Sequence, residues 1–263
     1  MNELERTIEW HDGTVLMIDQ RVLPLHYEIK SYTTYQGVAE AIHTMVIRGA
    51  PAIGAAAGFG MALAGLQSAA KTRLDLLRDL EVAAEVLRKS RPTAVNLFWA
   101  IDRVLRTATD ESLDSADDVR QALVREAQKI ADEDVEINKR MAEHGAALVK
   151  DGDTILTHCN TGALAVVDYG TALGVIRRAH EQGKRIKVFA DETPPALFPV
   201  QAGREYGPHR HGRAAQIVQP NFFLTVGGLQ VFEALLEFPD FRQTCTQACC
   251  GPHDARFSPG DGL

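Results

Sequence analysis

The sequence predicts an α/β protein in which a mostly helical N-terminal part with a small β-hairpin precedes a parallel sheet. Asp12-Gly13 separates two segments of alternating polarity, which favours a hairpin. Between residues 36 and 148, apolar residues recur mostly at helical spacing. After residue 153 a strand, a helix and a second strand follow in close succession, which is typical of a βαβ unit and therefore of a parallel sheet.

The first helices are expected over residues 36–47, from Pro51 onward, and over 74–90. Proline suits the first turn of a helix, because its missing N–H has no intrahelical partner there. A fourth helix is expected after Pro92, with Thr93 as its N-terminal cap.

A long amphipathic helix is expected to begin at Ser115, which forms a capping-box pattern with Asp118. Its predicted apolar face consists of Val119, Leu123, Ile130, Ile137 and Met141. Asp134 interrupts this face. We interpret Asp134 as a polar group bonded to a neighbouring backbone or side chain, in preference to a site residue.

The pattern changes after this helix. Residues 153–160 read as a strand that ends in polar residues, 169–184 as a helix, and 185–192 as a second strand. The sequence therefore predicts a helical domain over 1–150 and the start of an α/β domain over 151–193.

Composition excludes several classes of function. The chain has 263 residues, of which 45% are hydrophobic and 24% charged, and a formal net charge of −7. Because no basic block is present, binding to nucleic acid by phosphate neutralisation is not expected. Four cysteines and a charged N-terminus without a signal-peptide pattern predict a reduced, cytoplasmic protein. Residues 49–66 lack charge, but their alanines and glycines favour a tightly packed helix over a membrane span.

Arg48, Gly49 and Ala50 precede the small-residue helix. Bare backbone amides at a helix N-terminus, together with a guanidinium group, favour binding of an anion such as a phosphate. Arg91 repeats the arrangement ahead of the helix that follows Pro92. Two such arginines could bind one phosphorylated ligand, and the alternative is that each simply pairs with a carboxylate.

Cys159 lies where the first strand of the predicted parallel sheet ends, at the edge where α/β folds bind ligands. A single cysteine is often a small buried apolar residue. Its polar neighbours His158 and Asn160 favour a functional site instead.

Four segments together resemble a known family: "VIRGAPAIGAAA", "RPTAVNL", "ILTHCNTGALA" and "YGTALGVI". They are similar to signature segments of the S-methyl-5-thioribose-1-phosphate isomerases of methionine salvage. The wider group includes archaeal ribose-1,5-bisphosphate isomerases and the alpha, beta and delta regulatory subunits of the translation-initiation guanine-nucleotide exchange factor. The resemblance covers residues 5 to about 193.

The resemblance implies a Rossmann-like second domain, a homodimer, a small-molecule sugar-phosphate substrate, and neither a metal nor an organic cofactor. It implies that Arg48, Gly49 and Ala50 contact the substrate phosphate, that Arg91 binds substrate, and that Cys159 is the active-site cysteine. The implied reaction is the aldose–ketose isomerisation of 5-methylthioribose 1-phosphate. Ribose-1,5-bisphosphate isomerisation and a non-catalytic regulatory role are the alternatives.

Residues 194–263 depart from this resemblance. Pro194 and Phe198 stand where the family has an arginine and a substrate-binding glutamine, and the segment with its catalytic aspartate is missing from 195–263. We therefore expect an incomplete sheet, a poorly ordered tail, low stability and impaired isomerase activity. Several histidines and cysteines of this tail do not have zinc-site spacing, so no metal site is predicted there: His209, His211, Cys245, Cys249, Cys250 and His253.

Overall fold

The computed structural model describes residues 4–191. The predicted hairpin is confirmed: β1 (Ile8–His11) and β2 (Thr14–Ile18) pair antiparallel, and β3 (Ile29–Tyr32) pairs with the other edge of β2. Asp12 and Gly13 both have positive φ, at 45° and 81°. Two consecutive left-handed residues match the twist of the flanking strands, which is why this dipeptide favours a two-residue hairpin.

Five helices lie between this sheet and the second sheet. They are α1 (Tyr35–His43), α2 (Ala50–Gln67), α3 (Arg73–Ser90), α4 (Val95–Ala108) and α5 (Ala116–Leu148). The first helix ends four residues earlier than its apolar pattern predicts. Met45 adopts a left-handed φ of 61°, and the N–H of Val46 donates to the carbonyl of Ala41, which closes the helix.

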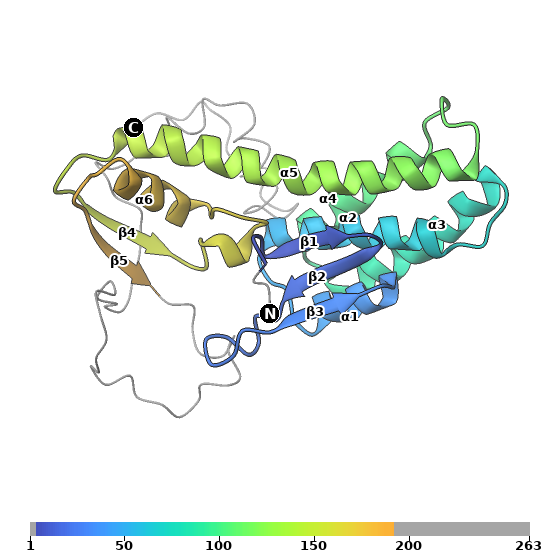
Figure 1. The fold of residues 1–263 in the computed structure, drawn as a ribbon, viewed down its shortest axis with the longest axis horizontal. Coiled ribbons are helices and arrows are strands. Elements are labelled where there is room, and N and C mark those ends of the chain that lie inside the picture. The colour runs from blue at the N-terminus through green and yellow to red at the C-terminus, as the bar shows by residue number, and fades with distance from the viewer. Residues whose placement is uncertain (1–3, 192–263) are drawn as a thin grey trace, which may run out of the picture.

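Helix α2 is the centre of the hydrophobic core, and it packs against α1, α3, α4 and α5 (Figure 1). A Cβ atom on Gly58 would lie 3.3 Å from Cδ1 of Ile130, and one on Gly65 only 2.5 Å from Cδ1 of Leu123. The small residues therefore let the neighbouring helices approach closely. In the part of the chain described, α2 alone is long and apolar enough to cross a membrane, and 78% of that segment is buried inside the protein.

Helix α5 runs along the length of the molecule (Figure 1). Its capping box is confirmed, since Ser115 and Asp118 bond reciprocally. The predicted apolar face needs a correction, because Ile137 and Met141 are only half-buried, whereas Val135, Asn138 and Ala142 are buried. The first part of α5 packs on α2 and α4, and its last part packs on α6.

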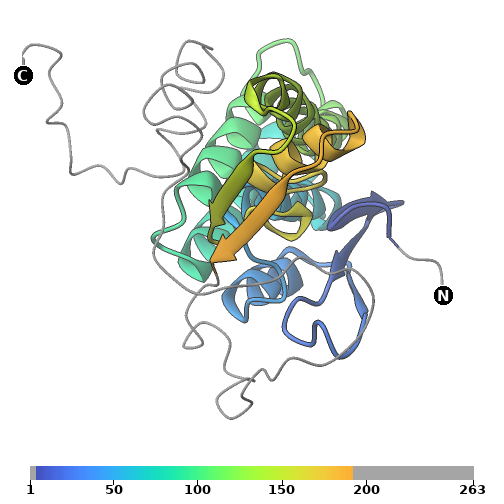
Figure 2. The same ribbon diagram turned by 90° about the vertical axis from the view of Figure 1, so that its left-hand side faces the viewer.

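The predicted βαβ unit is confirmed. Strand β4 (Thr154–His158) leads through a 3₁₀ turn η1 (Ala163–Ala165) to α6 (Ala172–Glu181) and then to β5 (Lys187–Asp191). The strands β4 and β5 pair in parallel and point the same way in Figure 2. The described chain is therefore an α/β protein with one antiparallel and one parallel sheet, while the Rossmann-like completion of the second sheet and the domain boundaries stay predictions.

Candidate functional site

Arg48, Gly49 and Ala50 lie at the N-terminus of α2 and are half-buried. Gly49 is the N-cap residue, with a φ of 91°, and no side chain within residues 4–191 caps the helix. Pro51 occupies the first turn, as predicted. Uncapped backbone amides beside an arginine form the type of helix N-terminus that binds anions.

Cys159 directly follows β4, at the edge of the sheet where both parallel strands end. The residue is exposed and has a φ of 65°, a left-handed conformation that is unfavourable for a side chain with a Cβ atom. The hydroxyls of Thr157 and Thr161 lie 3.0 Å apart, which closes the turn around Cys159. Strain of this kind is concentrated at functional sites.

The structure brings the Arg48 segment and the loop after Cys159 into contact. A Cβ atom on Gly49 would lie 2.2 Å from the backbone oxygen of Ala165 and 2.4 Å from its Cα. Only glycine permits this approach, and only glycine readily adopts its backbone conformation. Two motifs that are more than a hundred residues apart in the sequence therefore meet backbone to backbone.

Arg91 is the C-cap residue of α3 and is half-buried. The cap prediction for the next helix is wrong, because α4 has Ala94 as its N-cap residue and Thr93 is exposed. The N–H of Ala94 donates to the carbonyl of Arg91, and this turn delays the start of the helix.

The first turn of α4 packs on α2. A Cβ atom on Gly54 would lie 3.3 Å from the backbone oxygen of Asn96, so the segment after Arg91 approaches α2 one turn beyond Ala50. Nδ1 of His43 lies 3.4 Å from the carbonyl oxygen of Ser90, which joins the end of α1 to the residue before Arg91. Whether the side chains of Arg48, Arg91 and Cys159 contact one ligand stays a prediction.

Asp134 bonds to a neighbouring backbone, as interpreted from the sequence. Its Oδ2 accepts a hydrogen bond of 2.7 Å from the N–H of Val167. The pKa of Asp134 is raised to about 6, mainly by burial and to a smaller extent by the nearby Asp168 carboxylate, while the hydrogen bond from the N–H of Val167 acts in the opposite direction. The carboxyl group thereby attaches α5 to the segment that follows Cys159.

Two further residues hold this segment, and the sequence reasoning missed both. The Thr7 hydroxyl donates to the carbonyl of Ala163 over 2.7 Å, and Nε2 of Gln20 donates to the carbonyl of Leu164 over 2.7 Å. Thr7 and Gln20 are both buried. In the sequence, Thr7 and Gln20 are polar residues at the ends of predicted strands, which is the only feature that could have singled them out. Their partners are more than a hundred residues away in the chain, so the sequence does not identify them.

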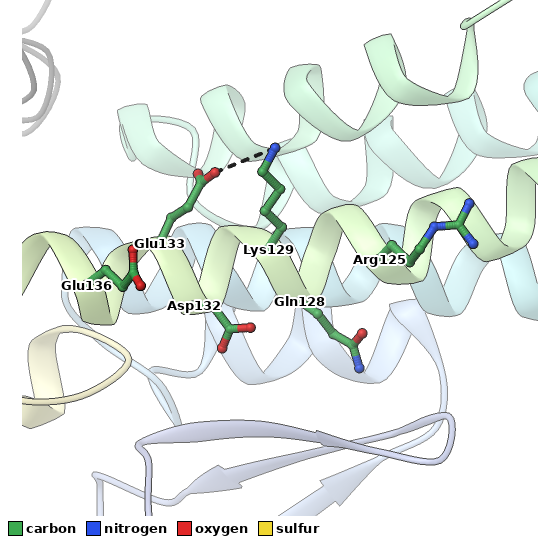
Figure 3. A pocket seen from close by; sticks show the side chains of 6 residues that line it. All are labelled: Arg125, Gln128, Lys129, Asp132, Glu133 and Glu136. Atoms are coloured by element: carbon green, nitrogen blue, oxygen red, sulfur yellow. Dashed lines mark ion pairs between the residues drawn. The ribbon is translucent and has the colours of Figure 1, made fainter. Parts of the chain in front are cut away.

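A pocket on the outer surface of α5 contains none of the predicted site residues (Figure 3). Its lining consists of Arg125, Gln128, Lys129, Asp132, Glu133 and Glu136. Lys129 and Arg103 pair with Glu133, and Arg6 pairs with Asp132. Because these charges neutralise one another, the pocket is a solvated ion-pair surface.

No group of three metal-binding side chains occurs within residues 4–191. The histidines and cysteines of the tail, and with them Pro194 and Phe198, lie outside the described residues.

Residues 46–203 match the Initiation factor 2 subunit family. Methylthioribose-1-phosphate isomerases from Geobacter metallireducens and from Caldanaerobacter subterraneus subsp. tengcongensis are each 54% identical, over 192 and 193 residues. In both cases the alignment covers 73% of this chain and 56% of the relative, so the chain spans little more than half the length of these relatives.

Two solved structures have a similar fold. The crystal structure of 5-methylthioribose 1-phosphate isomerase from Pyrococcus horikoshii OT3 has a TM-score of 0.69 and 47% identity, and the match covers 74% of this chain and 55% of that one. The translation initiation factor eIF-2B subunit delta from A. fulgidus has a TM-score of 0.66 and 45% identity, with 75% and 57% covered.

Proposed function

The chain belongs to the Initiation factor 2 subunit family, and from this premise we propose that it is an aldose–ketose isomerase for 5-methylthioribose 1-phosphate. The product is 5-methylthioribulose 1-phosphate, an intermediate of methionine salvage. One observation supports this best: the backbone of Gly49 packs against Ala165, six residues after Cys159. A phosphate bound at the N-terminus of α2 would then lie beside the thiol-bearing loop.

The roles of the residues follow from their chemistry. Arg48 and Arg91 supply guanidinium groups, which bind phosphate through charge-assisted hydrogen bonds. Gly49 and Ala50 supply the backbone at the helix N-terminus. The thiol of Cys159 faces the reacting carbons of the sugar.

The isomerisation needs two steps. The phosphate ester on C1 blocks spontaneous ring opening, so the site must first open the ring. Hydrogen then moves from C2 to C1, either as a proton through an enediol or as a hydride. Both routes are favoured in a pocket from which water is excluded. Neither route requires an organic cofactor or a metal, and we propose none.

We further propose that the protein acts in the cytoplasm as a homodimer, without nucleic acid or membrane partners. Turnover by this chain alone is expected to be low, because residues 195–263 lack the segment that supplies the family's catalytic aspartate. Binding and turnover must therefore be measured separately.

Isothermal titration calorimetry with 5-methylthioribose 1-phosphate tests the proposal. The variant Arg48→Met is expected to weaken binding by about 10- to 100-fold, the value of a charge-assisted hydrogen bond. Arg78→Met is the control, because Arg78 lies on the exposed face of α3 and pairs with Asp75 three residues away. Cys159→Ser should retain binding and lose any residual turnover.

The alternatives give different results in the same experiment. Tighter binding of ribose 1,5-bisphosphate would favour the isomerase of that sugar. Absence of binding to either sugar would contradict the enzyme proposal and favour a regulatory subunit, the alternative suggested by the 45% identity with the eIF-2B subunit delta structure.

A further inference from the structure

Gln20 contacts both segments of the candidate site. Its backbone N–H donates to the carbonyl of Val46 over 3.0 Å, two residues before Arg48. Its side-chain Nε2 donates to the carbonyl of Leu164 over 2.7 Å, five residues after Cys159. Gln20 is buried, with 7% of its surface exposed, so water does not compete strongly for either bond.

The location of Gln20 makes this link short and stiff. The residue follows β2 by two positions, and the N–H of Asp19 beside it donates to the carbonyl of Glu28, which fixes the backbone there. The Asp19 carboxylate also pairs with Arg21 over 2.7 Å, and that hydrogen bond holds the pKa of Asp19 below its ordinary value. Bonds outside the site therefore connect Asp19 to the residue that precedes β3 and to Arg21, on either side of Gln20.

Other bonds to the same loop do not reach the Arg48 segment. Thr7 bonds to Ala163 through its hydroxyl and to Val167 through its N–H, and Asp134 bonds to the N–H of Val167. These bonds hold the loop against β1 and α5. Gln20 alone among these three residues also bonds to the segment that leads into Arg48.

We propose that Gln20 is a positioning residue that sets the spacing between the Arg48 segment and the loop bearing Cys159. The contact of Gly49 with Ala165 limits how closely the two segments can approach, and Gln20 limits how far they can separate. The identity of the ligand rests on the proposed function. The coupling of the two segments through Gln20 does not.

The test compares two variants in which the new side chain has nearly the same size as the one that it replaces. Gln20→Met keeps the side-chain length and removes the donor to Leu164, and Thr7→Val keeps the side-chain shape and removes the donor to Ala163. Each removes one side-chain donor to a part-buried carbonyl of the same loop, and the carbonyl of Ala163 keeps the N–H of Val166 as a second donor. Both should lower the urea midpoint of unfolding, Gln20→Met by at least as much as Thr7→Val.

Hydrogen exchange of the ligand-free chain separates the two roles. Gln20→Met should speed exchange at least threefold in peptides covering both 46–53 and 160–167, because residue 20 loses its bond to Leu164 but keeps its N–H bond to Val46 and so transmits the loosening to that segment. Thr7→Val should speed exchange only in 160–167. If Gln20→Met affects only 160–167, Gln20 is a structural residue of the loop and the proposal is overturned.

A ligand measurement tests the consequence for the site. In the wild type, 5-methylthioribose 1-phosphate should slow the alkylation of Cys159 by iodoacetamide. Mass spectrometry of the peptide that contains Cys159 measures the rate of alkylation. For Gln20→Met the half-protecting concentration should rise at least about tenfold, since losing one charge-assisted hydrogen bond to the phosphate weakens binding by about 10- to 100-fold. For Thr7→Val it should stay within about twofold.

The outcomes distinguish the positioning role of Gln20 from the proposed function of the site. Equal half-protecting concentrations for the two variants would overturn the positioning role. Absence of protection in the wild type would contradict the proposed function, while the hydrogen-exchange comparison would still decide the coupling through Gln20.

Discussion

Replacing Asp134 by asparagine tests whether the carboxyl group on α5 is held away from water. Burial raises its folded-state pKa from 3.8 to about 6, so the folded protein binds this proton more tightly than the unfolded chain does. The resulting contribution to stability is fully present below about pH 4, the unfolded pKa. It is lost as the pH rises through about 6.

The magnitude follows from the shift. A rise of the pKa from 3.8 to about 6 changes the free energy of unfolding by about 3 kcal/mol between low and high pH. About 1–2 kcal/mol of this change falls between pH 5 and pH 8. The amide that replaces the carboxyl group does not ionise, and its oxygen can still accept the N–H of Val167. We therefore expect the stability of Asp134→Asn, relative to wild type, to increase by about 1–2 kcal/mol from pH 5 to pH 8.

Urea unfolding followed by circular dichroism at pH 5, 6, 7 and 8 measures this difference. The control is Asp132→Asn on the same helix, whose side chain is 62% exposed and pairs with Arg6. Its stability relative to wild type should change by less than about 0.5 kcal/mol over the same range, since exposed ion pairs contribute little. A pH-independent difference for Asp134→Asn would refute the argument, because a carboxyl group in contact with water would give that result.

Two further predictions concern backbone conformation. Gly49→Ala should lower the free energy of unfolding by about 2–4 kcal/mol, because the new Cβ would overlap Ala165 and the φ of 91° disfavours a Cβ atom. Gly13→Ala is the control and should lower it by only about 1 kcal/mol. Its φ is also positive, but no atom of residues 4–191 lies within 4 Å of the place that its Cβ would take. Equal losses in urea unfolding would show that the contact with Ala165 is not tight. Cys159→Gly should be more stable than Cys159→Ala by about 0.5–1 kcal/mol, because the φ of 65° disfavours a Cβ atom, and equal midpoints would mean that this strain is absent.

The features that the sequence predicted well depend on residues close together in the chain. The hairpin at Asp12-Gly13 and the capping box of Ser115 with Asp118 involve at most four consecutive residues, so local conformational preferences determine them. The parallel pairing of β4 with β5 follows from the order strand, helix, strand in adjacent segments, because a helical crossover returns the chain to the same end of the sheet.

The features that the sequence did not predict depend on distant partners. Gln20 bonds to Leu164 across 144 residues, and Thr7 bonds to Ala163 across 156. No periodicity or motif relates such pairs. The Thr93 cap failed for another reason: a turn between Arg91 and Ala94 competes with the first turn of the helix, and the sequence pattern is compatible with both.

The proposed phosphate site beside Arg48 gives a reason for the many small residues of α2. A phosphate-binding helix terminus is effective only when its backbone amides are already oriented, since mobile amides must be ordered when the ligand binds. Helix α2 is enclosed by four other helices, and its glycines permit contacts that larger residues would block, as at Gly65 against Leu123. Enclosure fixes the axis of α2, and the contact of Gly49 with Ala165 fixes its terminus. The small side chains of α2 therefore hold its N-terminus in one place, which is what the proposed phosphate site at Arg48 requires.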